Sequence, residues 1–323
     1  MGAVTRRESN SHSRDLKVRV RQIRWEAEGV VSLLLENSDG SPLPEWEPGS
    51  HLDLNLPNGL VRNYSLCGDV DSDTWRIGVL REAAGGGGSA FIHDLLRVGS
   101  VLSGHGPRNN FFLETAQSYL FIAGGIGITP MLAMIAYAEK LGIPWRLLYG
   151  GRERVSMAFT SELQAYGERV RIHPHDEYGL LPLSKVLSKP TPGELVYCCG
   201  PEPLLSAVES AMKNWPGGSL FVERFKSAAV QPKTGGQIEV VAQASGITVF
   251  VAPDQSILAA LEAAGINVPN SCREGICGTC ETNIVEGIAD HRDSLLSDSE
   301  RESNSTLMVC VSRCTGPRLV LDI

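Results

Sequence analysis

The sequence predicts a multidomain protein with an antiparallel β-barrel, then an α/β domain with a parallel sheet, and then a small β-grasp-like domain. Three observations support this order. Residues 16–113 show strand patterns separated by turns, residues 114–226 alternate apolar runs with helical stretches, and residues 237–323 contain four cysteines in a distinctive spacing. A chain of 323 residues is long enough for two or three domains with separate cores.

The barrel prediction rests on short strands joined by turns. Residues 51–56 read HLDLNL, and this alternation of polar residues with leucine is typical of a half-buried strand. Further strands are predicted at Val30–Glu36 and Trp75–Arg81, with a turn at Asn58-Gly59. Several short strands without long helical patterns favour a small antiparallel barrel.

The α/β prediction rests on strands that alternate with helices. The strands are expected at residues 119–123, 145–149, 170–173, 195–199 and 219–222, and the clearest helices at 130–141 and 204–213. This alternation predicts a parallel sheet that is covered on both faces. The apolar stretch Tyr119–Ala138 is long enough to cross a bilayer. Three glycines and Pro130 interrupt it, so a strand, a tight turn and a helix explain it better than a membrane span.

Composition excludes several classes of function. A net charge of −8 argues against nucleic-acid binding, which favours a basic face. Residues 1–15 are polar, lack the pattern of a signal peptide and are expected to form a disordered tail. Eight cysteines are too sparse for a disulfide scaffold, and clustered thiols favour a reducing, cytoplasmic setting. We therefore expect a cytoplasmic protein, present as a monomer, with no membrane or nucleic-acid partner.

The last domain follows residues 227–236, which have the composition of a linker. Strands are predicted at Ile238–Ala242 and Ile247–Val251, and a helix at Ser256–Ala264. Beyond them lie the cysteines that read C-x4-C-x2-C and, after a long gap, one more: Cys272, Cys277, Cys280 and Cys310.

This spacing is that of a plant-type [2Fe–2S] ferredoxin. Gly275 and Gly278 let the backbone curl tightly, so that amide N–H groups can approach the cluster. A structural zinc site is the alternative, but zinc usually draws its ligands from two C-x2-C pairs, and only one is present here. We predict that the four cysteines hold a [2Fe–2S] cluster, with Cys310 contributed by a distant strand and Cys314 a small buried hydrophobe.

The predicted cluster domain is acidic. Residues 237–323 contain five basic and twelve acidic residues, which gives −7 of the chain's net −8. This charge is consistent with a docking face for a basic redox partner. It is equally consistent with a solvated surface.

Two glycine-rich segments could bind phosphate groups. The segment 62–65 reads R-N-Y-S, and Arg81 and the glycines 85–88 precede Ser89 and a short helical stretch. Amides at a helix N-terminus bind phosphate, although on its own a tetraglycine is more typical of a flexible linker. The segment 124–130 reads G-G-I-G-I-T-P between a strand and a helix, which suits either a pyrophosphate or a packing turn.

A third segment, C-C-G-P at 198–201, ends the fourth predicted strand of the α/β domain. Ligands of open α/β sheets bind at the carboxyl ends of strands, although a buried inert cysteine is the default for each thiol. In this order the R-x-Y-S, G-G-x-G-x-T-P, C-G-P and cysteine motifs resemble the phthalate dioxygenase reductase family of the ferredoxin–NADP reductase superfamily. The resemblance covers residues 16–323.

The resemblance implies a role for each motif. Arg62, Tyr64 and Ser65 would hold FMN, and Arg81, Gly88 and Ser89 its phosphate. Gly125, Gly127, Thr129 and Pro130 would line the pyridine-nucleotide site, and Cys199 and Gly200 would lie near the nicotinamide. Phe225 would cover the flavin ring, or alternatively is a core aromatic next to the linker. Ser65, Cys199 and Phe225 would lie nearest to the chemistry.

The implied function is an NADH-dependent reductase that passes electrons through FMN and the cluster to a Rieske-type aromatic-ring oxygenase. The alternatives are a reductase for another oxygenase or demethylase, and a redox carrier or sensor without turnover. NADH rather than NADPH is expected from the family and from Asp176 and Glu177, although Arg152 and Arg154 argue for NADPH.

Overall fold

The computed structural model describes residues 14–82, 86–226 and 236–323. The predicted tail up to residue 13, Gly85 of the tetraglycine, and all but the last residue of the predicted linker lie outside these ranges. The chain divides into two compact units, Met1–Glu223 and Arg224–Ile323, and each is described by itself.

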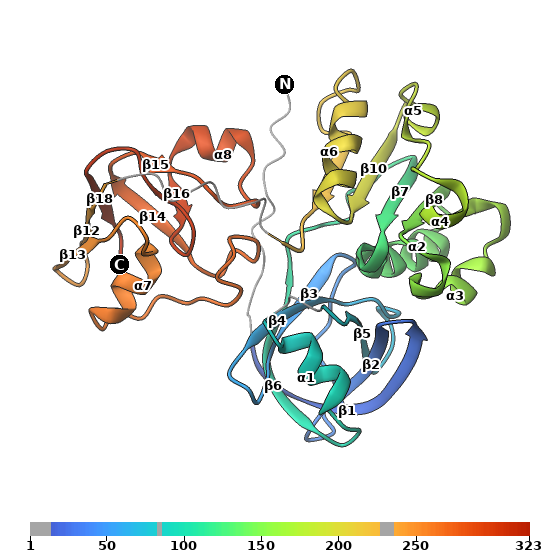
Figure 1. Cartoon of the computed structure of the whole chain (residues 1–323), viewed down its shortest axis with the longest axis horizontal. Coiled ribbons are helices and arrows are strands. Elements are labelled where there is room, and N and C mark those ends of the chain that lie inside the picture. The colour runs from blue at the N-terminus through green and yellow to red at the C-terminus, as the bar shows by residue number, and fades with distance from the viewer. Residues whose placement is uncertain (1–13, 83–85, 227–235) are drawn as a thin grey trace. The chain divides into compact units, whose positions relative to one another are not determined.

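The first unit opens with a six-stranded antiparallel sheet in the order β4-β3-β6-β1-β2-β5 (Figure 1). Its strands are β1 (Arg14–Ala27), β2 (Val30–Asn37), β3 (Ser50–Asn55), β4 (Val61–Ser65), β5 (Trp75–Leu80) and β6 (Val101–Asn109), and the helix α1 (Gly88–Asp94) lies between β5 and β6 in the chain. An isolated bridge between Leu66 and Ile77 links the segments at the two ends of the sheet. The predicted antiparallel barrel is therefore confirmed.

The polar face of β3 differs from the half-buried pattern expected for it. Asp53 is 1% exposed, and its carboxylate accepts hydrogen bonds from Asn63 of β4 and Arg108 of β6. His51 is also buried and stands opposite Arg108 in the strand register. Burial and the nearby Arg108 lower the pKa of His51 to about 4, and Asp53 opposes this only in part. An ion pair with Arg108 of β6 and a hydrogen bond from Asn63 of β4 thus replace the expected contact with water.

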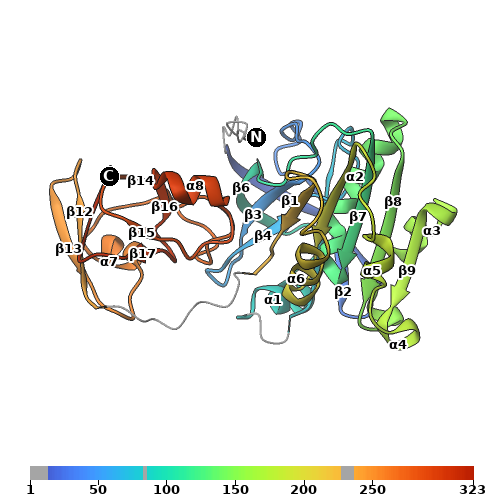
Figure 2. The ribbon, with the colours of Figure 1, turned by 90° about the horizontal axis from the view of Figure 1, so that it is seen from above.

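The α/β part of the first unit is a five-stranded parallel sheet in the order β11-β10-β7-β8-β9. Its strands are β7 (Ser118–Gly124), β8 (Trp145–Gly151), β9 (Val170–Pro174), β10 (Glu194–Cys199) and β11 (Leu220–Glu223). The helices are α2 (Ile128–Leu141), α3 (Thr160–Gln164), α4 (His175–Tyr178), α5 (Leu183–Val186) and α6 (Glu202–Ala211), with short 3-10 turns η1 (Gly125–Gly127), η2 (Arg154–Ser156) and η3 (Gly167–Arg169). All five predicted strands are present, and Figure 2 shows β7, β8 and β9 running side by side.

Packing in this sheet follows the alternation of side chains along the strands. Ile122 of β7 and Val196 of β10 pack with Leu205 and Val208 of α6. The apolar stretch noted in the sequence is β7, η1 and α2, as predicted. Among the described residues, no helix is both long and apolar enough to cross a bilayer.

The described residues of the second unit form a five-stranded sheet, a two-stranded sheet and two helices. The larger sheet has the order β13-β12-β18-β14-β16, in which β12 and β18 are parallel and the other pairs antiparallel. Its strands are β12 (Ile238–Ala242), β13 (Ile247–Val251), β14 (Glu281–Glu286), β16 (Thr306–Met308) and β18 (Arg318–Leu321). The smaller sheet pairs β15 (Ala289–Asp290) with β17 (Arg313–Cys314), and the helices are α7 (Ile257–Ala263) and α8 (Asp298–Ser303).

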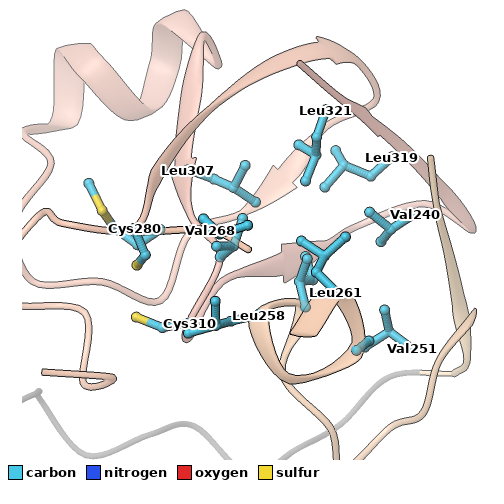
Figure 3. Close-up of a cluster of buried hydrophobic side chains, with 14 of the residues drawn as sticks. Val240, Val251, Leu258, Leu261, Val268, Cys280, Leu307, Cys310, Leu319 and Leu321 are labelled. Carbon is cyan, nitrogen blue, oxygen red and sulfur yellow. The ribbon is translucent and has the colours of Figure 1, made fainter. Parts of the chain in front are cut away.

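The core of this unit lies between α7 and the larger sheet. Leu258 and Leu261 of α7 pack with Val240, Leu307 and Leu319 of the strands (Figure 3). The arrangement is the predicted β-grasp-like fold, and it leaves one end of the core for the cysteines.

Candidate functional site

The four predicted ligand cysteines come from two segments of the second unit. Cys272, Cys277 and Cys280 lie in the loop between α7 and β14. Cys310 lies in the turn after β16 rather than in a strand, which corrects the sequence expectation. Figure 3 shows the side chains of Cys280 and Cys310 at one end of the hydrophobic core. The β-grasp therefore brings together Cys280 and Cys310, which are 30 residues apart in the chain.

The four thiols form two hydrogen-bonded pairs. Cys272 donates to Cys277, which lowers the pKa of the Cys277 thiol to about 5 and raises that of Cys272. In the same way, Cys310 donates to Cys280, which lowers the pKa of Cys280 and raises that of Cys310. Each pair thus shares a proton that a metal would displace.

Two pairs of thiols fit a two-iron cluster, because four cysteines divided between two irons give two ligands to each. Among the described residues, no three His, Cys, Asp or Glu side chains converge as they would around a single metal ion. The two pairs of thiols are the arrangement that the predicted [2Fe–2S] cluster requires.

Backbone amides surround the sulfurs. The N–H of Glu274 donates to Sγ of Cys272 at 3.3 Å, and the hydroxyl of Thr279 lies 3.2 Å from Sγ of Cys277. Gly275 has a φ of 70°, and a Cβ at this position would lie 2.5 Å from a methyl group of Val311. Only glycine fits this curl without strain, as the sequence predicted.

In the first unit, Arg62 lies beside the start of α1. A Cβ on Gly88 would lie 2.7 Å from Nε of Arg62, and one on Gly86 would lie 3.2 Å from its Nη2. The first turn of α1 carries no acidic residue, and Gly87 caps it without a side chain. Amides and a guanidinium at one place are the groups that bind a phosphate.

The structure brings Arg62, and not Arg81, to this loop. Nη1 of Arg81 lies 2.7 Å from Oδ1 of Asp94, the last residue of α1 and thus at its other end. Ser89 is buried, and its hydroxyl accepts a hydrogen bond from the N–H of Glu82 at 2.9 Å. Ser89 therefore ties the start of α1 to Glu82, and its contact with a phosphate stays a prediction.

Tyr64 and Ser65 occupy consecutive positions at the end of β4, so that their side chains point to opposite faces. Tyr64 packs against the barrel core, and this burial raises its pKa, although Arg62 opposes the shift. Ser65 is buried opposite His51 in the register. The contacts of both residues with a flavin stay predictions.

The two glycine motifs of the α/β part meet at the carboxyl ends of β7 and β10. A Cβ on Gly127 would lie 2.3 Å from the carbonyl oxygen of Cys199, and one on Gly200 would lie 3.0 Å from Cα of Gly124. β7 pairs with β8 on one side and with β10 on the other, so the chain order reverses here. Ligands of open α/β sheets bind at such a switch point.

The helix α2 begins at this junction. No acidic residue lies in its first turn and no side chain caps it, so its amides suit an anionic group. The hydroxyl of Thr129 donates to the carbonyl of Ile126 at 2.9 Å, and both Thr129 and Pro130 are buried. These two residues support the turn. Gly125, with a φ of 56°, and Gly200 stay candidates for direct contact with a nucleotide.

A carboxyl group that sequence reasoning missed lies beside Cys199. Glu223, the last residue of β11, stands opposite Cys199 in the register and is hydrogen-bonded to it. Burial raises the pKa of Glu223 to about 8, and burial and then Glu223 raise that of Cys199. Sequence reasoning singled out Phe225, two residues further along the chain, and not Glu223. Phe225 itself is partly buried and belongs to the second unit, so its place over a flavin stays a prediction.

Comparison with known proteins agrees with this architecture. The family model of the 2Fe-2S iron-sulfur cluster binding domain matches residues 240–315. The chain is 40% identical over 317 residues to a reductase subunit of the toluene-4-sulfonate monooxygenase system of Comamonas testosteroni, which covers 96% of this chain and 100% of the relative.

Two solved structures resemble the whole chain. Phthalate dioxygenase reductase, described as a modular structure for electron transfer from pyridine nucleotides to [2Fe-2S], has a TM-score of 0.74 and 35% identity, with 96% of this chain and 98% of that chain covered. An intact type IV self-sufficient cytochrome P450 monooxygenase has a TM-score of 0.87 and 42% identity over 96% of this chain. This chain spans only 41% of the P450 protein.

The fold and the cysteine site define an oxidoreductase that joins a flavin-type barrel and a nicotinamide-type sheet to an iron–sulfur domain. The chain belongs to the phthalate dioxygenase reductase family.

Proposed function

We propose that this reductase carries electrons from NADH through FMN and a [2Fe–2S] cluster to a separate oxygenase component of the Rieske type. The observation that carries the proposal is the set of four cysteines arranged as two pairs, in one chain with the arginine at α1 and the glycine junction of β7 and β10. When bound, the nicotinamide supplies electrons in pairs, the flavin separates them, and the cluster passes them on singly.

The chain's own residues bind and orient these groups. Arg62 and the first amides of α1 would hold the flavin phosphate, and the start of α2 would hold the pyrophosphate of the nucleotide. Cys199 and Glu223 stay protonated at neutral pH and so place no negative charge beside the nicotinamide. The amides around the cysteines stabilise charge on the sulfurs.

NADH is preferred over NADPH in this proposal. In the sequence, Arg152 and Arg154 favoured NADPH. In the structure, Arg154 donates hydrogen bonds to Glu177 through both Nε and Nη2, the latter at 2.7 Å. A guanidinium already paired with a carboxylate is a poor partner for a 2′-phosphate, whereas carboxylates suit the 2′-hydroxyl of NADH.

We expect kcat/KM for NADH to exceed that for NADPH by tenfold or more, measured by flavin reduction and cytochrome c reduction with both nucleotides. Arg154→Ala should leave the NADH value within twofold, because in this proposal the side chain of Arg154 binds Glu177 and not the nucleotide. Equal values for the two nucleotides would refute the preference.

The proposal also specifies the type of oxygenase that accepts the electrons. The acidic charge of residues 237–323 suits a basic docking surface on that partner. A cytochrome P450 acceptor is the second candidate, because a similar chain is fused to a P450 in a solved structure. Purified oxygenases of both types, added to the reductase and NADH, decide between them through the rate of NADH oxidation.

We also propose that the protein is a monomer in the cytoplasm, because a reducing compartment keeps the four ligand thiols free of disulfide bonds.

The alternative function, a redox carrier without turnover, would lack a flavin. An absorption spectrum of the purified protein separates the two, because the reductase must show flavin bands together with iron–sulfur absorption.

A further inference from the structure

A buried acidic side chain lies directly behind the loop that carries three of the cysteines. Asp293 follows β15, and its side chain is 0% exposed. A Cβ built on Gly275 would lie 3.1 Å from Cα of Asp293 and 3.3 Å from its Cβ, so the two segments are in contact. The proposed electron path does not itself use this carboxylate.

The carboxylate closes a turn formed by residues 293–296, which we name the Asp293 turn. Its Oδ2 accepts hydrogen bonds from the N–H groups of Leu295 at 3.0 Å and Leu296 at 2.8 Å. Arg301 of α8 donates to the carbonyl oxygen of Asp293 at 2.6 Å and lies 3.8 Å from Oδ2. Hydrogen bonds to a charged group are the stronger kind, so the turn is held firmly.

The Asp293 turn is bonded to the peptide unit that serves the cysteine sulfurs. The N–H of Ser294 donates to the carbonyl oxygen of Gly275 at 3.0 Å. That carbonyl shares a planar peptide with the N–H of Ile276, which donates to the sulfur of Cys272. The N–H of Gly275 donates to the sulfur of Cys310. Because the carbonyl and N–H of a trans peptide point in opposite directions, holding one orients the other.

We propose that Asp293 is a positioning residue for the iron–sulfur cluster: its carboxylate closes the Asp293 turn, and the turn aims the amides of Gly275 and Ile276 at the sulfurs, which raises the cluster's reduction potential. Hydrogen bonds to the sulfurs favour the reduced, more negative form. The inference rests on the proposed function only in that the cysteines hold a [2Fe–2S] cluster.

The charge of the Asp293 carboxylate and the positions of the amides that it holds have opposite effects on the reduction potential. Substitutions can therefore distinguish one effect from the other. Removing a negative charge near the cluster makes reduction easier and raises the potential. Misplacing the amides makes reduction harder and lowers it. Besides Arg301, the ionisable side chain of His291 faces the carboxylate, with its Nδ1 3.9 Å from Oδ1 of Asp293.

Two substitutions separate these effects. Asp293→Glu keeps the charge but moves the carboxylate, and Asp293→Asn removes the charge but keeps an oxygen that can accept from Leu295 and Leu296. Asp298→Asn removes an exposed charge from the first turn of α8 and is the control. The potential is measured by dye-mediated spectroelectrochemical titration of the full chain, without NADH or an oxygenase.

We expect Asp293→Glu to lower the reduction potential of the cluster by about 28 mV or more. This shift corresponds to a threefold change in the one-electron equilibrium constant. Asp293→Asn should stay at or above the wild-type value, and Asp298→Asn should stay within twofold. A potential in Asp293→Glu equal to or above wild type overturns the inference. If Asp293→Glu assembles no cluster, the test uses Asp293→Asn instead. A reduction potential of Asp293→Asn below that of the wild type then overturns the inference.

The same titration distinguishes this failure from failure of the proposed function. A protein that contains no iron–sulfur chromophore refutes the proposed function. If the iron–sulfur absorption is normal but Asp293→Glu does not lower the reduction potential, only the role of Asp293 is refuted.

Discussion

At the ends of β10 and β11, a thiol and a carboxyl group lie side by side, and burial decides their ionisation. Water solvates a thiolate or a carboxylate far better than a protein interior does, so burial raises the pKa of both Cys199 and Glu223. Since the pKa of Glu223 lies near 8, against 4.5 for an exposed carboxyl, this group is neutral in the folded protein at pH 7.

The stability of the protein should therefore fall as pH rises from 4.5 to 8, because the unfolded chain releases the Glu223 proton more readily than the folded chain. Glu223→Gln stays neutral and should lose this dependence, with a difference on the order of 5 kcal/mol by pH 9. Thermal unfolding from pH 5 to 9 measures it. Glu202→Gln, at an exposed position of α6, is the control. Parallel curves for wild type and Glu223→Gln would contradict the neutral carboxyl group.

Single residues were predictable where a motif surrounds them. The cysteine spacing identified four residues that the fold does bring together as two pairs. Glu223 and Asp293 were not predictable, because one acidic residue carries no pattern and each acts through a partner distant in the sequence. Asp53 looked solvent-facing for the same reason, since Arg108 lies 55 residues further along the chain.

At the scale of elements, periodic segments were predicted well and polar ones were missed. The strands β12 and β13 have the predicted bounds. In β12 buried residues alternate with partly buried ones, and β13 buries Val249 and Val251 on either side of the exposed Phe250. The helix α8 has no apolar periodicity and is instead defined by a capping box between Ser297 and Glu300. The strand β1 places Leu16, Val18 and Val20 in the core, but its many charged residues hid this alternation.

The backbone at the end of β10 lies so close to Gly127 that this position has no room for a side chain. In Gly127→Ala the added Cβ would meet the carbonyl of Cys199 at 2.3 Å and the nitrogen of Gly200 at 2.8 Å, so the start of α2 must move. We expect KM for NADH to rise tenfold or more and stability to fall by about 1–3 kcal/mol. Steady-state kinetics and thermal unfolding measure the two effects.

Gly142→Ala is the matched control, because Gly142 ends α2 at a φ of 66° with no atom within 4 Å of an added Cβ. It should lose about 1–2 kcal/mol from backbone strain while KM for NADH stays unchanged. An unchanged KM in Gly127→Ala would contradict a nucleotide site at this junction.

At the scale of the whole molecule, each part of the chain suits one step of a path that begins with an electron pair and ends with single electrons. In the proposed function, the glycine junction of β7 and β10 would bind the nucleotide, Arg62 and α1 would bind the flavin, and the cysteine pairs would bind the cluster. Membership of the reductase family fits this division. The organic substrate belongs to the oxygenase partner, which is why no motif of this chain identifies it.

Anaerobic titration of the purified protein with NADH, followed by visible absorption, tests the path most directly. In the wild type, flavin and iron–sulfur absorption should both be bleached, and cytochrome c should then be reduced. In Cys277→Ser, which removes one ligand of the first thiol pair, NADH should still bleach the flavin while cytochrome c reduction is lost. Full-rate cytochrome c reduction by Cys277→Ser, or a wild-type protein that contains zinc and no iron, would contradict the account.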